Sequence, residues 1–184
     1  MTQNLYHGTS VSKADSLQNH GIIEDKLQSR DRGFFGEGLY VTPDKEIAQR
    51  HAETVAQKTN GEAEIIQIST QASSIFEPGE VFPSDGSIRP VGRPEWHEEF
   101  ISWYLGKLED AAVWEKIESA SREGILSRGR EEMDPESDRF DREDWYKEVT
   151  AYGFEAGYSI VWWTNSEVII NPSEEITVTR NIEL

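Results

Sequence analysis

Short apolar runs bounded by turn residues predict β-strands at both ends of the chain. They cover residues 5–7, 38–42 and 64–70 near the N-terminus, and 158–163, 167–170 and 175–180 near the C-terminus. Asparagine, serine and proline, which favour turns, separate the last three runs. The C-terminal part is therefore predicted to be rich in β-structure.

Apolar residues at helical spacing predict helices between these strands. The first helix begins after a capping serine, Ser10 or Ser12, and ends at Gly21. The second covers about residues 45–58 and begins after Asp44, which can cap it. Two further helices are predicted over residues 95–122 and 144–152.

Polar and proline-rich segments predict loops at residues 24–33, 76–94 and 128–144, the last of which is almost entirely charged. Strands at both ends and helices in an acidic middle predict an α+β fold. The length of 184 residues favours a single domain. We expect its core at about 1–75 and 150–184, with a helical insertion at about 95–148.

Composition limits the possible functions. Apolar residues make up 36% of the chain and there are six tryptophans, enough for a packed core. Cysteine is absent, which excludes disulfides and thiolate sites and fits a reducing compartment. The net charge of −17 repels phosphate backbones, so nucleic acid is a disfavoured partner and a basic protein surface a favoured one.

No membrane or metal partner is expected. Apolar runs fall well short of the roughly 20 residues that a membrane span needs, and the N-terminus lacks a signal pattern, so a cytoplasmic location is expected. Residues 134–144 carry alternating acids as calcium loops do, but Arg139 occupies the place of the turn glycine and Trp145 that of the final glutamate. The four histidines lack the spacing of zinc ligands.

Three polar or aromatic residues lie in or at the ends of the predicted strands. His7 ends the first strand, Tyr40 follows two glycines, and Glu167 begins an apolar strand, where a carboxylate is unfavourable. Singly, each has an ordinary interpretation: a histidine bonded to backbone, a core tyrosine and a solvent-facing glutamate. Gly36 and Gly38 likewise fit either a bulge or turn, or the close approach of a flat ligand.

Taken together, three segments resemble the signature blocks of the ADP-ribosyltransferase superfamily, in the histidine–tyrosine–glutamate branch that includes diphtheria-type toxins and the poly(ADP-ribose) polymerases. They are YHGT at 6–9, FGEGLYVT at 35–42 and SEVIINPSEEITV at 166–178. Their order and spacing agree with the family, over roughly residues 1–70 and 150–184. The resemblance implies a split β-sheet core with flanking helices, and NAD as substrate without a metal.

The resemblance also implies roles for individual residues. Glu167 would stabilise the cation that develops on the ribose as nicotinamide leaves, and His7 would bond a ribose hydroxyl. Tyr40 would stack on nicotinamide, and the backbone of Gly8 would meet the carboxamide. Thr9 and Gly38 would complete the cofactor site, with His51, whose imidazole can stack, in place of the family's second tyrosine.

Ala48 stands where the polymerases have a serine, and their helical regulatory domain is lacking, so a single transfer is expected. The expected activity is mono-ADP-ribosylation of a protein, with the helical insertion selecting the partner. Transfer to nucleic acid and a non-catalytic acidic mimic are the alternatives. A toxin or effector delivered into a target cell is a further hypothesis, by analogy alone.

Overall fold

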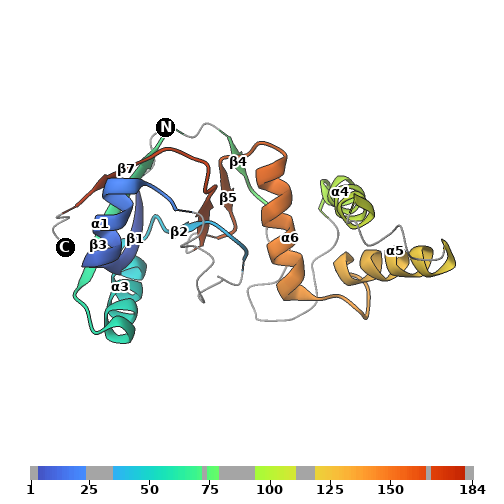
Figure 1. Ribbon diagram of the computed structural model, residues 1–184, viewed down its shortest axis with the longest axis horizontal. Helices are drawn as coiled ribbons and strands as arrows, with labels where there is room; N and C mark the ends of the chain where they lie inside the picture. The colour runs from blue at the N-terminus through green and yellow to red at the C-terminus, as the bar shows by residue number, and fades with distance from the viewer. Residues whose placement is uncertain are drawn as a thin grey trace. The chain divides into compact units, whose positions relative to one another are not determined.

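The computed structural model describes residues 4–23, 35–71, 74–78, 94–110, 119–164 and 167–180. The chain divides into two compact units, and Figure 1 labels the helices and strands of both. The mixed unit comprises Met1–Gly33, Glu37–Glu77 and Gly157–Leu184, and the helical unit comprises Phe34–Gly36 and Pro78–Ala156.

The mixed unit carries all the described strands and two helices. In chain order they are β1 (Leu5–Ser10), α1 (Val11–His20), β2 (Leu39–Val41), α3 (Lys45–Thr59), β3 (Ala63–Thr70), β4 (Ile75–Phe76), β5 (Ile160–Trp162), β6 (Val168–Ile170) and β7 (Ile176–Thr179). One sheet has the order β1-β3-β7 and the other the order β2-β6-β5-β4. Each sheet thus joins strands from both ends of the sequence, and among the described strands only β4 pairs in parallel, with β5.

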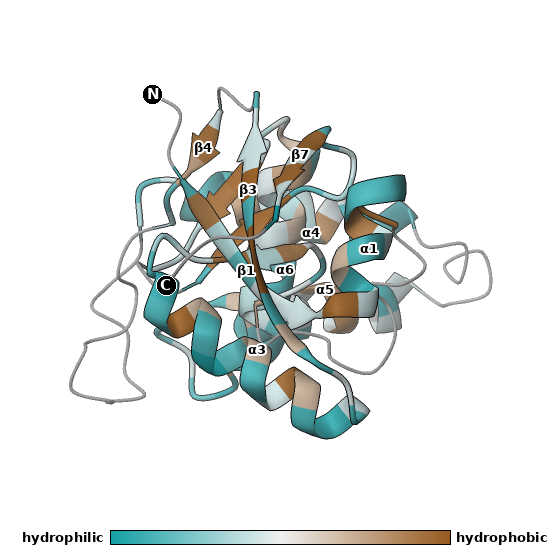
Figure 2. Cartoon of the chain, turned by 90° about the vertical axis from the view of Figure 1, so that its left-hand side faces the viewer, coloured by the Kyte–Doolittle hydropathy of each residue, from teal (hydrophilic) through white to brown (hydrophobic). Residues whose placement is uncertain are grey.

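The two faces of the β1-β3-β7 sheet are covered by different elements. On one face, Leu5, Ile66 and Ile68 pack with Ala14 of α1 and with apolar residues of β2, β5 and β6 in the main core cluster. On the other face, Ile65 packs with Ala48 and other small residues of α3. In Figure 2, hydrophobic residues are concentrated on strands such as β4 and β7, whereas the surfaces of α1 and α3 are predominantly hydrophilic. Successive side chains of a strand point to opposite faces, so β3 contributes apolar residues to the clusters on both faces of the sheet.

Helix α3 shows how the local sequence sets an element. The Asp44 side chain accepts hydrogen bonds from the amides of Glu46 and Ile47, at 2.8 and 3.2 Å, and so caps the first turn. Asn60 ends the helix in the left-handed conformation, with φ of 50°. Small residues on the buried face allow α3 to lie close against the sheet.

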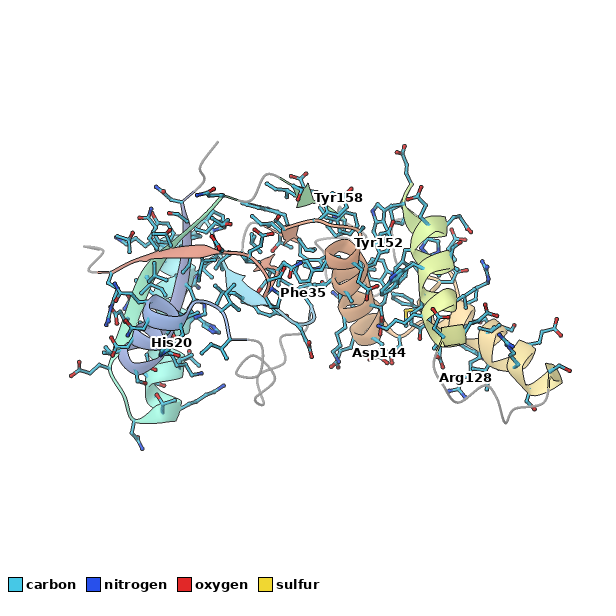
Figure 3. All side chains as sticks on the ribbon, turned by 45° about the horizontal axis from the view of Figure 1, so that its top comes forward. His20, Phe35, Arg128, Asp144, Tyr152 and Tyr158 are labelled. Carbon is cyan, nitrogen blue, oxygen red and sulfur yellow. The ribbon has the colours of Figure 1, made fainter. Side chains whose placement is uncertain are left out.

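The helical unit packs α4 (His97–Asp110), α5 (Ser119–Met133) and α6 (Arg142–Glu155) around aromatic side chains. Phe100 and Trp145 are fully buried and meet edge to face, with ring centroids 6.4 Å apart. Trp96 lies 5.8 Å from Trp145 between ring centroids. The side chains of this unit, including Tyr152 on α6, are visible in Figure 3.

The α+β class is confirmed, and the predicted strands and helices are largely present. The loop predicted over 128–144 is wrong at both ends, because α5 continues to Met133 and α6 begins at Arg142. Charge alone did not distinguish a loop from a charged helix: Arg128 and Glu132 form an i,i+4 ion pair at 2.7 Å that supports α5. Strand β4 was not predicted.

Some predictions lie outside the described residues. These are the loop at 24–33, most of the connection at 76–94, and part of the helix predicted over 95–122. No helix in the described ranges is both long and apolar enough to cross a membrane.

Candidate functional site

His7 interrupts the pairing between β1 and β2. Tyr6 and Thr42 exchange two backbone hydrogen bonds, of 2.7 and 2.9 Å. Bonded pairs alternate along an antiparallel ladder, so the next pair would be Gly8 and Tyr40. Instead, His7 Nδ1 lies 2.7 Å from the Tyr40 carbonyl oxygen and donates to it. The imidazole thus takes the place of the next backbone bond, and the two strands separate there.

This bond fixes the chemistry of the His7 ring. A carbonyl oxygen only accepts, so Nδ1 carries the proton and Nε2 presents a lone pair in the neutral ring. Burial lowers the pKa of His7 from 6.5 to about 4, and the nearby positive charges of His51 and Lys13 act in the same direction. His7 is therefore neutral at pH 7 and offers an acceptor to a hydroxyl donor.

Acid should destabilise the mixed unit through His7. The native pKa of about 4 lies below the ordinary 6.5, so between these values the unfolded chain binds a proton that the native chain does not. Stability should then fall as pH falls, by up to about 1.4 kcal/mol per pH unit in this window. Urea unfolding of wild type and His7→Gln at several pH values checks this. Parallel pH profiles of the two proteins would contradict the buried, neutral state of His7.

Gly8 is enclosed by α3 on its side-chain face. A Cβ there would lie 1.9 Å from the Ala48 carbonyl oxygen and 2.7 Å from the Ala52 amide nitrogen. Strand alternation from Tyr6 directs the N–H and C=O of Gly8 away from β3, toward the edge where β2 diverges. Gly8 therefore both permits the packing of α3 and presents backbone polar groups at this edge. Its neighbour Thr9 is buried, at 1% exposure.

Tyr40 and Glu167 lie on one face of the second sheet. Tyr40 pairs with Ile169, and their neighbours on both strands enter the main core, so these two side chains occupy the opposite face. Glu167 continues the β5–β6 ladder by one position, because the Trp163 amide donates to its carbonyl oxygen at 3.1 Å. Glu167 is two residues before Ile169 and therefore shares its face with Tyr40.

The backbone of Glu167 is held in a turn by hydrogen bonds that do not involve its carboxylate. Its amide nitrogen lies 3.2 Å from the Thr164 carbonyl oxygen and 3.1 Å from the Thr164 hydroxyl. Within the described ranges, the carboxylate makes no hydrogen bond or ion pair, and burial raises the pKa of Glu167 above 4.5. A partly buried carboxylate without a partner is costly and is typical of functional sites.

The other predicted site residues are placed as follows. Gly36 and Gly38 have φ of 109° and 151°, so both adopt backbone conformations that favour glycine. They form the bend that leads into β2, which supports the turn interpretation of these glycines. His51 is exposed on α3 and near enough to His7 to lower its pKa.

Two neighbours of Glu167 were not identified from the sequence. Thr164 orients the Glu167 amide, and Trp163 is its cross-strand partner. The spacing Thr-x-x-Glu at 164–167 is a recognised pattern of side-chain-to-backbone bonding and could have indicated the first. The position of Trp163 opposite Glu167 depends on the register of β5 with β6, and no local sequence pattern determines that register.

The acidic residues do not assemble a metal site in the part of the chain that the structure describes: no three His, Asp or Glu side chains come together as ligands would. In the helical unit, Glu131 pairs with Arg139 at 3.1 Å and Glu132 with Arg128 at 2.7 Å. Both carboxylates therefore contribute to intramolecular ion pairs as well as to the negative charge of that unit.

No family model matches the chain, and no curated protein matches it. A crystal structure of an anti-CRISPR protein aligns with a TM-score of 0.43 and 17% sequence identity, over 97% of this chain and 96% of the other. A likeness at that level carries no conclusion about function.

Proposed function

We propose that the chain is an NAD-dependent mono-ADP-ribosyltransferase that acts on a protein. One observation carries the proposal: His7 bonds the carbonyl of Tyr40 at the point where β1 and β2 separate, and Glu167 shares a sheet face with the Tyr40 side chain. The three residues of the proposed trio thus belong to one unit. Their arrangement fits a split β-sheet core of the ADP-ribosyltransferase kind.

Each group would have a distinct task in cleaving the nicotinamide–ribose bond. The neutral His7 would accept a hydrogen bond at Nε2 from a ribose hydroxyl, and the Tyr40 ring would stack on the nicotinamide ring. The Gly8 amide and carbonyl would meet the carboxamide. As the C–N bond breaks, positive charge develops on the ribose, and the Glu167 carboxylate would stabilise it. A nucleophile of the acceptor then forms the new bond to the anomeric carbon, and nicotinamide leaves with the bonding electrons.

A protein acceptor is favoured by charge. With 18 basic and 35 acidic residues the chain repels nucleic acid and attracts basic surfaces. The helical unit supplies no member of the trio, and we propose that it selects the acceptor. Transfer to nucleic acid is the alternative within the same chemistry.

The deciding experiment incubates the full chain with NAD labelled in the adenylate part and a cell lysate. Nicotinamide release reports bond cleavage, and the label reports transfer. Label that is removed by protease supports the proposal, and label that is removed by nuclease supports the alternative acceptor. Release without label transfer would make the protein an NAD hydrolase, and no release would refute NAD chemistry.

NAD binding should depend on Tyr40 more than on His51. Tyr40→Ala removes the proposed stacking surface, which contributes roughly 0.5–1.5 kcal/mol beyond area burial, and so should weaken binding by about two- to twelvefold. His51→Ala should weaken binding less, and His51→Tyr should strengthen it, because phenol presents a larger ring. Calorimetric titration with NAD measures all three, and wild-type affinity in both alanine variants would disprove the pocket.

A further inference from the structure

Helices α4 and α6 of the helical unit meet through aromatic and acidic side chains. Tyr152 of α6, labelled in Figure 3, lies against Trp103 of α4, with ring centroids 5.6 Å apart and an angle of 61° between the ring planes. The Trp103 indole Nε1 donates to Glu155 Oε2 at 2.9 Å, and the Tyr152 hydroxyl donates to Glu99 Oε2 at 3.3 Å. Each ring thus bonds a carboxylate of the other helix, and we call these four residues the α4–α6 seam.

The two carboxylates of the α4–α6 seam keep their negative charge. Indole N–H and phenol O–H are neutral donors, so each bond satisfies one oxygen of a carboxylate without neutralising it. Among the described residues, neither Glu99 nor Glu155 forms an ion pair, and both are exposed. The seam therefore presents two uncompensated charges next to two partly exposed aromatic rings.

The chain itself places a cation beside this seam. Lys107 follows Trp103 by one turn of α4, and its ammonium nitrogen lies 5.0 Å from the Trp103 ring centroid and 2.8 Å from Glu148 Oε2 of α6. A cation over an indole ring is attracted by the π-system, and a neighbouring carboxylate adds a charge-assisted hydrogen bond. Lys107 compensates the charge of Glu148, whereas the charges of Glu99 and Glu155 remain for a cation from another molecule.

We propose that the α4–α6 seam binds arginine side chains in a basic segment of a partner protein. A guanidinium is planar, stacks on aromatic rings and carries five N–H donors, so it can contact a ring and a carboxylate at the same time. Lysine carries a more strongly hydrated point charge and should bind less tightly. The net charge of −17 attracts such a segment from a distance. Binding requires only contacts of the helical unit, but its use in choosing an acceptor rests on the proposed function.

The test titrates the full chain by calorimetry, without NAD, with a short peptide of alternating arginine and serine. The salt concentration is about 0.15 M, where distant charges are screened. Wild type should bind this peptide, bind its lysine counterpart more weakly, and fail to bind a version in which citrulline, a neutral isostere, replaces arginine. Glu99→Gln combined with Glu155→Gln keeps oxygens that accept from Tyr152 and Trp103 but removes both charges. This variant should bind the arginine peptide about two- to thirtyfold more weakly, the range for two exposed charge pairs.

The matched control combines Glu123→Gln with Asp138→Asn, two exposed residues of the same unit outside the seam. It removes the same total charge and should bind the arginine peptide as wild type does. Equal weakening in the control and the seam variant would indicate general charge attraction and overturn the inference. So would equal affinity for the lysine or citrulline peptide, or no binding of the arginine peptide by wild type.

The proposed function is tested apart from this binding. If it holds, the seam variant should also slow labelling of the protein acceptor. If wild type does not cleave NAD, the proposed function fails, and the peptide titration alone decides whether the seam binds arginine.

Discussion

Glu167→Gln should abolish most of the nicotinamide release while leaving NAD binding nearly unchanged. The amide keeps the size and much of the hydrogen-bonding capacity of the side chain but removes its charge. That charge matters chiefly when the ribose becomes cationic, so its contribution belongs to the transition state. Loss of one preorganised electrostatic partner costs about 10²–10³ in rate, or ~3–4 kcal/mol. Nicotinamide release, with NAD affinity measured by calorimetry, gives both quantities.

The matched controls for this prediction are Glu174→Gln and Glu175→Gln. Both carboxylates lie between β6 and β7 of the same unit, and the Glu174 amide is engaged in the turn with the Asn171 carbonyl oxygen at 3.0 Å. If charge in this region merely tunes solubility, all three variants should behave alike. Wild-type turnover in Glu167→Gln would remove the basis of the transferase mechanism.

Gly8→Ala should unfold the mixed unit rather than only weaken a ligand. The new methyl would lie 1.9 Å from the Ala48 carbonyl oxygen, which belongs to the α3 backbone and cannot rotate away as a side chain can. Relief requires that α3 moves off the sheet, which exposes the cluster of Ile65, Ala48 and Ala52. Overpacking typically costs about 1–3 kcal/mol, and a clash with backbone should cost at least the upper value. Urea unfolding monitored by circular dichroism measures it.

Gly61→Ala is the control within the same unit. A Cβ there would meet the Thr59 hydroxyl at 3.3 Å, the end of a side chain that can turn aside. Its effect should stay within about 1 kcal/mol, the usual size of a glycine effect at a tolerant site. Equal stability of the Gly8 and Gly61 variants would show that α3 is not held against β1 as described.

The elements with strong local signals were predictable from the sequence. The capping aspartate and small-residue stripe of α3, and the apolar runs of β3 and β5–β7, were recognised from their own residues. Segment 128–144 was not, because a run of charges predicts a solvated loop and reveals neither the i,i+4 ion pairs of α5 nor the cap that Asp141 provides for α6. Strand β4 has only two residues, too few for a period to be visible.

The candidate site was predictable in its residue types but not in its geometry. His7 and Glu167 stood out as polar groups at the ends of predicted strands, and Tyr40 as an aromatic residue after two glycines, although β1 continues past His7 to Ser10. That His7 bonds the Tyr40 backbone depends on where β1 and β2 part, and this follows from long-range register. The same holds for Phe35 and Gly36, which precede β2 in sequence but pack on α6, more than a hundred positions later in the chain.

Both sheets of the mixed unit draw on the two ends of the chain, with β7 beside β3 and β6 beside β2. A fragment that ends before residue 167 has neither Glu167 nor β6, the strand that pairs with β2 and Tyr40. We expect these distant pairings to form late in folding, because the entropy of closing a long loop must be overcome first. The three candidate residues can therefore come together only after the segment that carries β5, β6 and β7 has been made and has paired with the N-terminal strands.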